Sequence, residues 1–201
     1  DARFRRWVKI STSLPIRRLV AFRRESNRGV PAWSHEKGDF PSSWTVAGPP
    51  LTAGGRVYTT SAQYGQTVLI FASCYDAATG ERLWRTRICS GQLQLNMFGN
   101  TMREYTASPL AYSEGVLYGC TNLGVCWAVE AATGEIRWLS FYESRRPKDR
   151  NYITGPGGWS RNLWANNPPL VCGDRVLYAP ADSSHALAVD TADGRPLWRV
   201  H

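Results

Sequence analysis

The chain has 201 residues, carries a net charge of +8, and is 43% hydrophobic and 20% charged. This composition describes a globular chain that is long enough to bury a core. The sequence holds no apolar run of about 18 residues, which excludes a helix that spans a membrane. It begins at Asp1 without an apolar signal-like run. We expect it to be cut from a longer protein, so the absence of a signal peptide does not indicate the cytoplasm.

The positive charge is concentrated at one end of the chain. Residues 1–28 hold nine Lys and Arg against two acids, a net +7, whereas residues 29–201 hold fifteen against fourteen, a net +1. A basic terminal segment can bind nucleic acid, anionic lipid or an acidic protein, and it can equally be a solvated or partner-covered face. The basic character therefore belongs to this segment and not to the body of the chain.

The first structural unit, residues 1–33, is incomplete. Strands are predicted at 6–10, 18–22 and 30–33, with a turn at 11–15. This unit carries most of the net positive charge of the chain, and the strand that should open it is missing.

Three complete units follow, at residues 34–84, 85–138 and 139–198. Each has room for four short strands and their turns, and no helical period runs through any of them. A twisted four-stranded sheet repeated about every 50 residues is typical of a propeller blade, and propellers need about four to eight blades to close. The sequence therefore predicts an all-β fold, a partial β-propeller with one incomplete and three complete four-stranded blades.

A short motif recurs near the end of every unit: an acid, a Gly four residues later, and a Trp four residues after the Gly. Clear copies lie at 74–84, 128–138 and 188–198, and a degraded copy lies at 25–33. We expect the acid to start a turn by accepting backbone hydrogen bonds and the Gly to supply a positive φ. The Trp offers a large apolar area and an indole N–H that needs a partner, which suits a wedge between neighbouring sheets. The residues assigned to blade docking are Gly29, Gly80, Gly134, Gly194, Trp33, Trp84, Trp138 and Trp198.

These motifs resemble the repeat of the PQQ-like (quinoprotein-like) β-propeller family. The residues that carry the resemblance are 108–109, 115–118 and 128–138, and again 169–170, 174–178 and 188–198. The chain looks most like the large multi-blade proteins of this family from bacteria such as planctomycetes. The resemblance implies that the repeated Trp residues dock one blade on the next. It also implies export to the periplasm or the cell envelope.

The family includes enzymes as well as scaffolds. Its PQQ-dependent alcohol dehydrogenases hold the quinone with a Ca²⁺ ion, a catalytic Asp and commonly an adjacent Cys-Cys pair. This chain has no adjacent Cys pair and no Cys-x-x-Cys-His motif for a covalent haem. We therefore expect no catalytic residue, no bound cofactor and no metal site. The side chains considered for such roles and set aside are the turn acids Asp76, Glu130 and Asp190 and the unevenly spaced His35, His185 and His201.

The resulting hypothesis is a non-catalytic propeller segment that acts as a scaffold or protein-interaction module of an exported complex. Its partners would be other proteins or the remaining blades of a longer propeller. The alternative is a fragment of a PQQ-dependent quinoprotein dehydrogenase whose catalytic residues, PQQ and Ca²⁺ lie in other blades. A third interpretation is a basic accessory subunit that residues 1–28 hold on a larger assembly.

Two loops between blades, 92–105 and 139–166, are the candidate interaction surface. Basic side chains beside exposed aromatic rings can pair and stack with a partner, although the rings can also pack as lids over the blades. Interleaved Arg and aromatic residues also suit single-stranded nucleic acid, but no groove motif supports this and we do not expect it. The residues assigned to the interaction loop are Arg145, Arg146, Lys148, Arg150, Trp159 and Trp164.

Two of the five cysteines form a candidate disulfide. Cys120 and Cys126 flank residues 122–124, which read as a three-residue hairpin loop with Gly in the left-handed position. That register puts the two cysteines opposite each other, where a cross-strand disulfide is geometrically feasible. The alternative is two free buried thiols.

Overall fold

The computed structural model describes residues 17–23, 30–35, 44–93, 105–144 and 167–201. These residues form 15 β-strands in four antiparallel sheets. Within the described part of the chain, no helix is long and apolar enough to cross a membrane.

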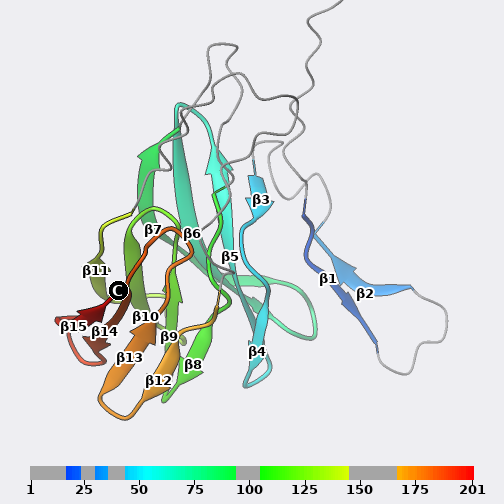
Figure 1. The fold of residues 1–201 in the computed structure, drawn as a ribbon. Coiled ribbons are helices and arrows are strands. Elements are labelled where there is room, and N and C mark those ends of the chain that lie inside the picture. Colours follow the sequence, from blue (N-terminus) through cyan, green and yellow to red (C-terminus); the bar gives the residue numbers. More distant parts are fainter. Residues whose placement is uncertain (1–16, 24–29, 36–43, 94–104, 145–166) are drawn as a thin grey trace, which may run out of the picture.

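The four sheets follow one another in chain order, from β1 and β2 at one end of the view to β15 at the other (Figure 1). The first sheet pairs β1 (Val20–Phe22) with β2 (Pro31–Ser34). The second contains β3 (Trp44–Val46), β4 (Leu51–Ala53), β5 (Arg56–Tyr64), β6 (Thr67–Asp76) and β7 (Arg82–Gln92). The third contains β8 (Ala111–Ser113), β9 (Val116–Cys120), β10 (Val125–Glu130) and β11 (Ile136–Phe141). The fourth contains β12 (Leu170–Cys172), β13 (Arg175–Tyr178), β14 (Ala186–Asp190) and β15 (Pro196–Val200).

The third and fourth sheets are simple meanders in which each strand pairs with the next along the chain. A series of separate four-stranded sheets of this kind is the architecture of propeller blades. The predicted all-β fold, a partial β-propeller with one incomplete and three complete blades, is confirmed. The division of the chain into units after residues 33, 84 and 138 stays a prediction.

The second sheet differs from the third and fourth because two short strands, β3 and β4, share one of its edges. Both β3 and β4 pair with the long strand β5, one after the other. Between them lie Pro49 and Pro50, which lack the N–H needed to continue a ladder. A Cβ on Gly48, in the same connection, would lie 2.7 Å from Thr60 Oγ1 and 2.9 Å from the carbonyl oxygen of Ser108. The break therefore lets the edge of the second sheet approach the segment that leads into the third.

The core lies between the sheets, and alternation along each strand divides the side chains between two interfaces. On β10, Val125, Trp127 and Val129 pack with the second sheet, whereas Cys126 and Ala128 pack with the fourth. Both faces of the third sheet are thus covered, and β9 is buried along its whole length. Such doubly covered strands read as nearly continuous apolar runs.

Candidate protein-interaction surface

A hairpin built around the repeated acid joins the last two strands of each complete blade. In the second sheet, Asp76 Oδ1 accepts hydrogen bonds from the backbone N–H groups of Ala78 at 2.9 Å and Thr79 at 2.8 Å. Gly80 donates its N–H to the Asp76 carbonyl at 2.9 Å and takes a φ of +77°, which favours Gly. The backbone N–H of Thr79, followed by its hydroxyl, holds the pKa of the Asp76 carboxyl below its usual value. Local hydrogen bonds therefore fix this turn.

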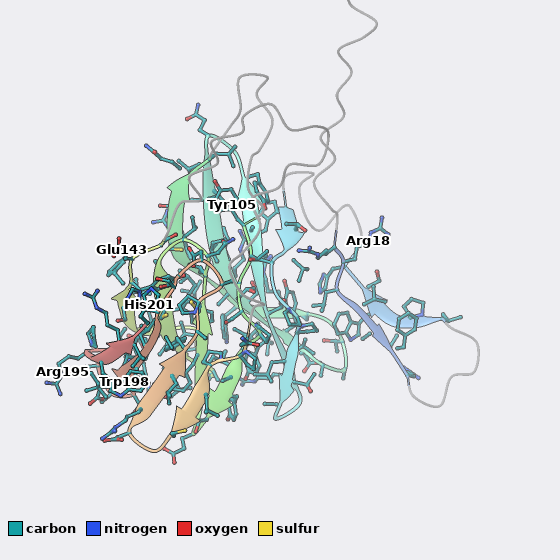
Figure 2. The ribbon with its side chains drawn as sticks, viewed as in Figure 1. Arg18, Tyr105, Glu143, Arg195, Trp198 and His201 are labelled. Carbon is teal, nitrogen blue, oxygen red and sulfur yellow. The ribbon has the colours of Figure 1, made fainter. Side chains whose placement is uncertain are left out.

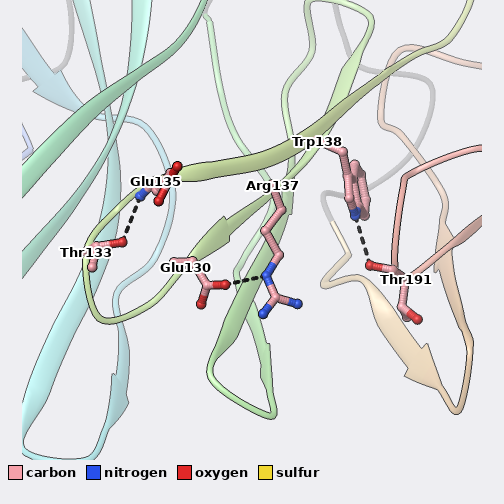
Figure 3. A network of polar contacts seen from close by, with 6 residues as sticks. All are labelled: Glu130, Thr133, Glu135, Arg137, Trp138 and Thr191. Atoms are coloured by element: carbon pink, nitrogen blue, oxygen red, sulfur yellow. Dashed lines mark hydrogen bonds and ion pairs between the residues drawn. The ribbon is translucent and has the colours of Figure 1, made fainter.

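The other two turns keep this backbone geometry with different side-chain contacts. In the fourth sheet, Asp190 Oδ1 accepts the backbone N–H of Ala192 at 2.8 Å. In the third sheet the acid is Glu130, whose longer side chain instead accepts a hydrogen bond from Arg137 Nε at 2.5 Å (Figure 3). The Glu130 carbonyl still accepts the N–H of Gly134 at 2.8 Å. The turn thus tolerates either acid because its backbone hydrogen bond is the constant feature.

The repeated tryptophans connect each sheet to the turn of the next sheet. The indole hydrogen bonds run from Trp33 Nε1 to the carbonyl of Ala77 at 2.9 Å, from Trp84 Nε1 to that of Ala131 at 3.0 Å, and from Trp138 Nε1 to that of Thr191 at 2.9 Å. The last of these is drawn in Figure 3. In every case the acceptor is the residue directly after the acid of the turn. The three contacts therefore have the same geometry.

The glycine of each turn also makes room for the indole ring. Added Cβ atoms on Gly80, Gly134 and Gly194 would lie 2.7, 2.5 and 2.5 Å from ring carbons of Trp33, Trp84 and Trp138 respectively. No real Cβ packs that closely, so these positions need Gly for the ring as well as for the positive φ. Gly173 differs, because its φ is +60° but nothing lies within 4 Å of an added Cβ.

The structure thus brings together three of the tryptophans and three of the glycines that the sequence assigned to docking. Gly29 lies outside the described residues. Sequence reasoning missed the acceptors, which are the carbonyls of Ala77, Ala131 and Thr191. A backbone group carries no residue identity, so the only available signal was its constant position after the acid.

In the second, third and fourth sheets, the docking Trp is the end of a row of side chains that runs in register across four strands. The row of the second sheet is Leu51, Tyr58, Cys74 and Trp84. The row of the third sheet is Ala111, Tyr118, Ala128 and Trp138. Both rows are covered by the following sheet, which presents its own apolar side chains to them. Trp138 is only 6% exposed as a result.

The fourth sheet carries the same row, but here its ends are open to solvent. The row is Leu170, Leu177, Ala188 and Trp198, in register from β12 to β15. Trp198 is 40% exposed and Leu170 is 60% exposed. Figure 2 shows Trp198 on the outer strand of this sheet, with Arg195 close by. We call this row, together with Val200 on the same side of β15, the Trp198 face. An exposed apolar row of this kind is a candidate interaction surface.

A small pocket of about 260 Å³ lies beside the end of β15 and is lined by His185 and His201. Their rings meet edge to face with centroids 4.9 Å apart, and Ser184 Oγ lies 3.1 Å from His185 Nδ1. The spacing of these two histidines along the chain does not predict their contact. Within the residues described, no group of three or more His, Cys, Asp or Glu side chains could hold a metal ion.

Polar contacts link the third and fourth sheets at the end of β11. The hydroxyl of Tyr142 donates to Asp182 Oδ1 at 2.5 Å and also contacts the carbonyl of Thr121. The hydroxyl of Ser144 donates to the other oxygen of Asp182. Burial, more than the neighbouring charges, raises the pKa of the Tyr142 phenol, so this group remains a donor at ordinary pH.

The candidate disulfide residues lie next to this link. Cys120 and Cys126 face each other on β9 and β10 as free thiols, with their sulfurs 3.4 Å apart. Burial, followed by the hydrogen bond with Cys120, raises the pKa of Cys126. Burial also raises the pKa of Cys89 to about 11.

The predicted interaction loops fall largely outside the described residues. That applies to Arg145, Arg146, Lys148, Arg150, Trp159 and Trp164, and to the segment 94–104 of the other loop. The two ends of the 92–105 loop are described, and the Tyr105 hydroxyl joins them by donating to the carbonyl of Gln92 at 2.9 Å. Figure 2 labels Tyr105 beside the long strands of the second sheet.

A family model described as "Outer membrane protein assembly factor BamB" matches residues 17–148 and 70–201 of the chain. A comparison with curated proteins finds no match. Among solved structures, BamB from Moraxella catarrhalis superposes with a TM-score of 0.55 at 18% identity, covering 91% of this chain and 43% of that one. The quinohemoprotein alcohol dehydrogenase from Comamonas testosteroni gives a TM-score of 0.46 at 18% identity, covering 77% of this chain and 21% of that one. The chain thus spans less than half of the length of either protein.

Proposed function

Because the chain belongs to the PQQ-repeat family whose model is described as outer membrane protein assembly factor BamB, we propose that it is a propeller segment that works as a protein-binding scaffold. The observation that carries this proposal is the Trp198 face. It repeats, at the same register positions, the two rows that are covered inside the molecule, with Leu177 in the place of Tyr58 and Tyr118, yet its docking Trp is 40% exposed. An exposed apolar row of this kind suits contact with another protein better than binding of a small molecule.

The two covered interfaces define the chemistry of the partner that fits. Each covering sheet supplies an acid-x-x-x-Gly turn, whose carbonyl after the acid accepts the indole N–H and whose Gly admits the ring. Each also supplies branched apolar side chains, such as Val176 and Val189 of the fourth sheet. The occupant of the Trp198 face is therefore a further blade of the same repeat, with this turn and an apolar row.

The proposed setting is the cell envelope, and the proposed role is protein assembly without a bound cofactor. The description of the family model names an outer membrane assembly factor, which supports this setting. The docking contacts consist of indole rings, backbone carbonyls and apolar rows, and such contacts hold protein surfaces together without any chemical step. An absorption spectrum of the purified protein tests the absence of a quinone.

The proposal is tested by extending the chain with a further blade that can cover the Trp198 face. A chain is made in which a second copy of residues 139–201 follows His201, with Trp198→Phe in the second copy only, and the oxidation of the original Trp198 is measured by mass spectrometry. We expect Trp198 to react several-fold more slowly in the extended chain than in the original one. The matched control replaces the Gly194 of the second copy with Val, which should block the indole and restore the reactivity of Trp198.

Three results would contradict the proposal. Trp198 could remain as reactive in the extended chain as in the original one, which would mean that a blade of this type does not fit. The original chain could prove to be a dimer with Trp198 protected, which would make a second copy the occupant. A co-purifying quinone band would favour the dehydrogenase alternative instead.

A further inference from the structure

Two buried thiols face each other across neighbouring strands of the third sheet and take no part in the docking surface. Cys120 on β9 and Cys126 on β10 are register partners, and the short turn between them runs from Thr121 to Val125. Their sulfurs lie 3.4 Å apart, and Cys126 Sγ donates a hydrogen bond to Cys120 Sγ. None of the other cysteines has a cysteine as its register partner, since Cys74 faces Tyr58 and Trp84, Cys89 faces Ile70, and Cys172 faces Arg175.

The backbone around Cys120 shows which kind of cross-strand pair this is. Its N–H donates to Ser108 Oγ at 3.0 Å, and its carbonyl accepts the N–H of Ser108 at 2.8 Å. Both groups therefore point away from β10, so Cys120 and Cys126 are a non-hydrogen-bonded pair. In such pairs the Cα atoms lie about 4.5 Å apart and the side chains come closest together.

That spacing meets the requirement for a disulfide. Bridged cysteines have Cα atoms about 4.4–6.8 Å apart and sulfurs about 2.05 Å apart. The two sulfurs of this chain can close the remaining distance by rotation about their side-chain bonds, while the strands stay in register. The neighbouring groups also allow for this, because the other contacts of Cys120 Sγ are long, at 3.5 Å to the carbonyl of Thr121 and 3.7 Å to the Tyr142 hydroxyl.

We propose that Cys120 and Cys126 are an oxidation site that a small-molecule or protein disulfide converts into an intrachain disulfide. The thiolate of Cys120, the less buried of the two, attacks the external disulfide, breaks its S–S bond and releases one thiol. Cys126 then attacks the mixed disulfide, forms the Sγ–Sγ bond and releases the second thiol. The chain loses two electrons and two protons, and the oxidant is reduced to two thiols.

The bond would act on the contact between the third and fourth sheets. The carbonyl of Thr121, which follows Cys120, contacts the Tyr142 hydroxyl, and that hydroxyl donates to Asp182 of the fourth sheet. A disulfide would pin both ends of the 121–125 turn and hold this carbonyl in place. Because both sulfurs are buried, oxidation is fastest while the chain folds or when this turn opens.

The test counts thiols in the whole chain. A Cys172→Ser background removes the exposed thiol and leaves four cysteines. The protein is refolded with oxidised glutathione, denatured and labelled with N-ethylmaleimide. We expect about two labels per chain after oxidation and about four after reduction, because one disulfide hides two thiols. Peptide mapping should place the bridge between residues 120 and 126.

Matched variants separate this pair from the other cysteines. Adding Cys126→Ser should abolish the bridge, so the oxidant should remove at most one label per chain, as a mixed disulfide between Cys120 and glutathione. Adding Cys74→Ser should lower both counts by one, because Cys74 has no cysteine opposite it. Four labels after refolding with the oxidant, or a bridge mapped to another pair, would overturn the proposal. The count on the background chain needs no further mutation, so a variant that fails to fold does not leave the question open.

Discussion

Trp138 and Trp198 occupy the same place in two consecutive repeats but have different surroundings. Both lie four residues after the turn Gly, and both face an Ala on the neighbouring strand. Trp138 is 6% exposed and bonded to Thr191 of the next sheet, whereas Trp198 is 40% exposed. The two sheets thus each carry both halves of a docking contact, the Trp and the turn. The Trp of the third sheet is covered by the fourth, whereas no sheet among the described residues covers the Trp of the fourth.

Removal of each indole in turn should give the largest difference in stability between the two positions. We expect Trp138→Ala to lower the free energy of unfolding by about 4 kcal/mol, as large buried aromatic truncations do. We expect Trp198→Ala to lower it by only about 1 kcal/mol, because its ring is partly in water already. Urea unfolding followed by circular dichroism measures both. Equal losses would show that the two positions are not differently packed.

The glycine side of the contact gives the next largest effect. Gly194→Ala should lower the free energy of unfolding by about 3 kcal/mol, since it adds overpacking against Trp138 to the strain of a left-handed residue. Gly173→Ala is the matched control, because its φ is also positive but the space around it is open. It should lower the same free energy by about 1 kcal/mol, from backbone strain alone. Similar losses for the two variants would argue against a steric role for the docking Gly.

The ion pair in the turn of the third sheet should contribute less to stability than the docking contacts do. Glu130 and Arg137 are joined at 2.5 Å, but their side chains are about one-third exposed (Figure 3). We expect Glu130→Gln to lower the free energy of unfolding by about 0.5 kcal/mol at low salt and by less in molar salt. A loss of several kcal/mol would mean that this ion pair, rather than the backbone hydrogen bond of the turn, fixes the hairpin of the third sheet.

The smallest expected effect is the titration of Asp76. Its pKa is lowered in the folded chain, so its contribution to stability is present above the unfolded value of about 3.9. That contribution is lost as the pH falls through the lower folded value. NMR titration of the Asp76 carboxyl should give a pKa below the ordinary value, and Asp76→Asn should remove this part of the acid sensitivity. A normal or raised pKa would contradict the hydrogen bonds assigned to the turn.

The turns and the role of the repeated Trp could be predicted from sequence because their causes are local. An acid, a Gly and a Trp at fixed spacing determine a hairpin, and the positive φ values of Gly80, Gly134 and Gly194 follow from it. The register of Cys120 with Cys126 was predictable for the same reason, since a short loop fixes the pairing.

The remaining features depend on contacts between residues far apart in the sequence. Tyr142 meets Asp182 across 40 residues, and Trp138 meets the carbonyl of Thr191 across 53. Neither partner carries a motif that marks it. The pairing of His185 with His201 depends on strand register, which histidine spacing alone does not reveal. Whether the Trp198 face is covered depends on the sheet that packs against it, and the sequence of a single repeat does not specify that sheet.

The most direct test of the docking account measures how fast each repeat Trp is oxidised in the folded 201-residue chain. Brief exposure to hydroxyl radicals, followed by peptide mass spectrometry, resolves Trp33, Trp84, Trp138 and Trp198 separately. We predict that Trp198 is oxidised several-fold faster than Trp138, in keeping with their exposed fractions of 40% and 6%. Equal and slow oxidation of the two indoles would contradict it, because the Trp198 face would then already be covered.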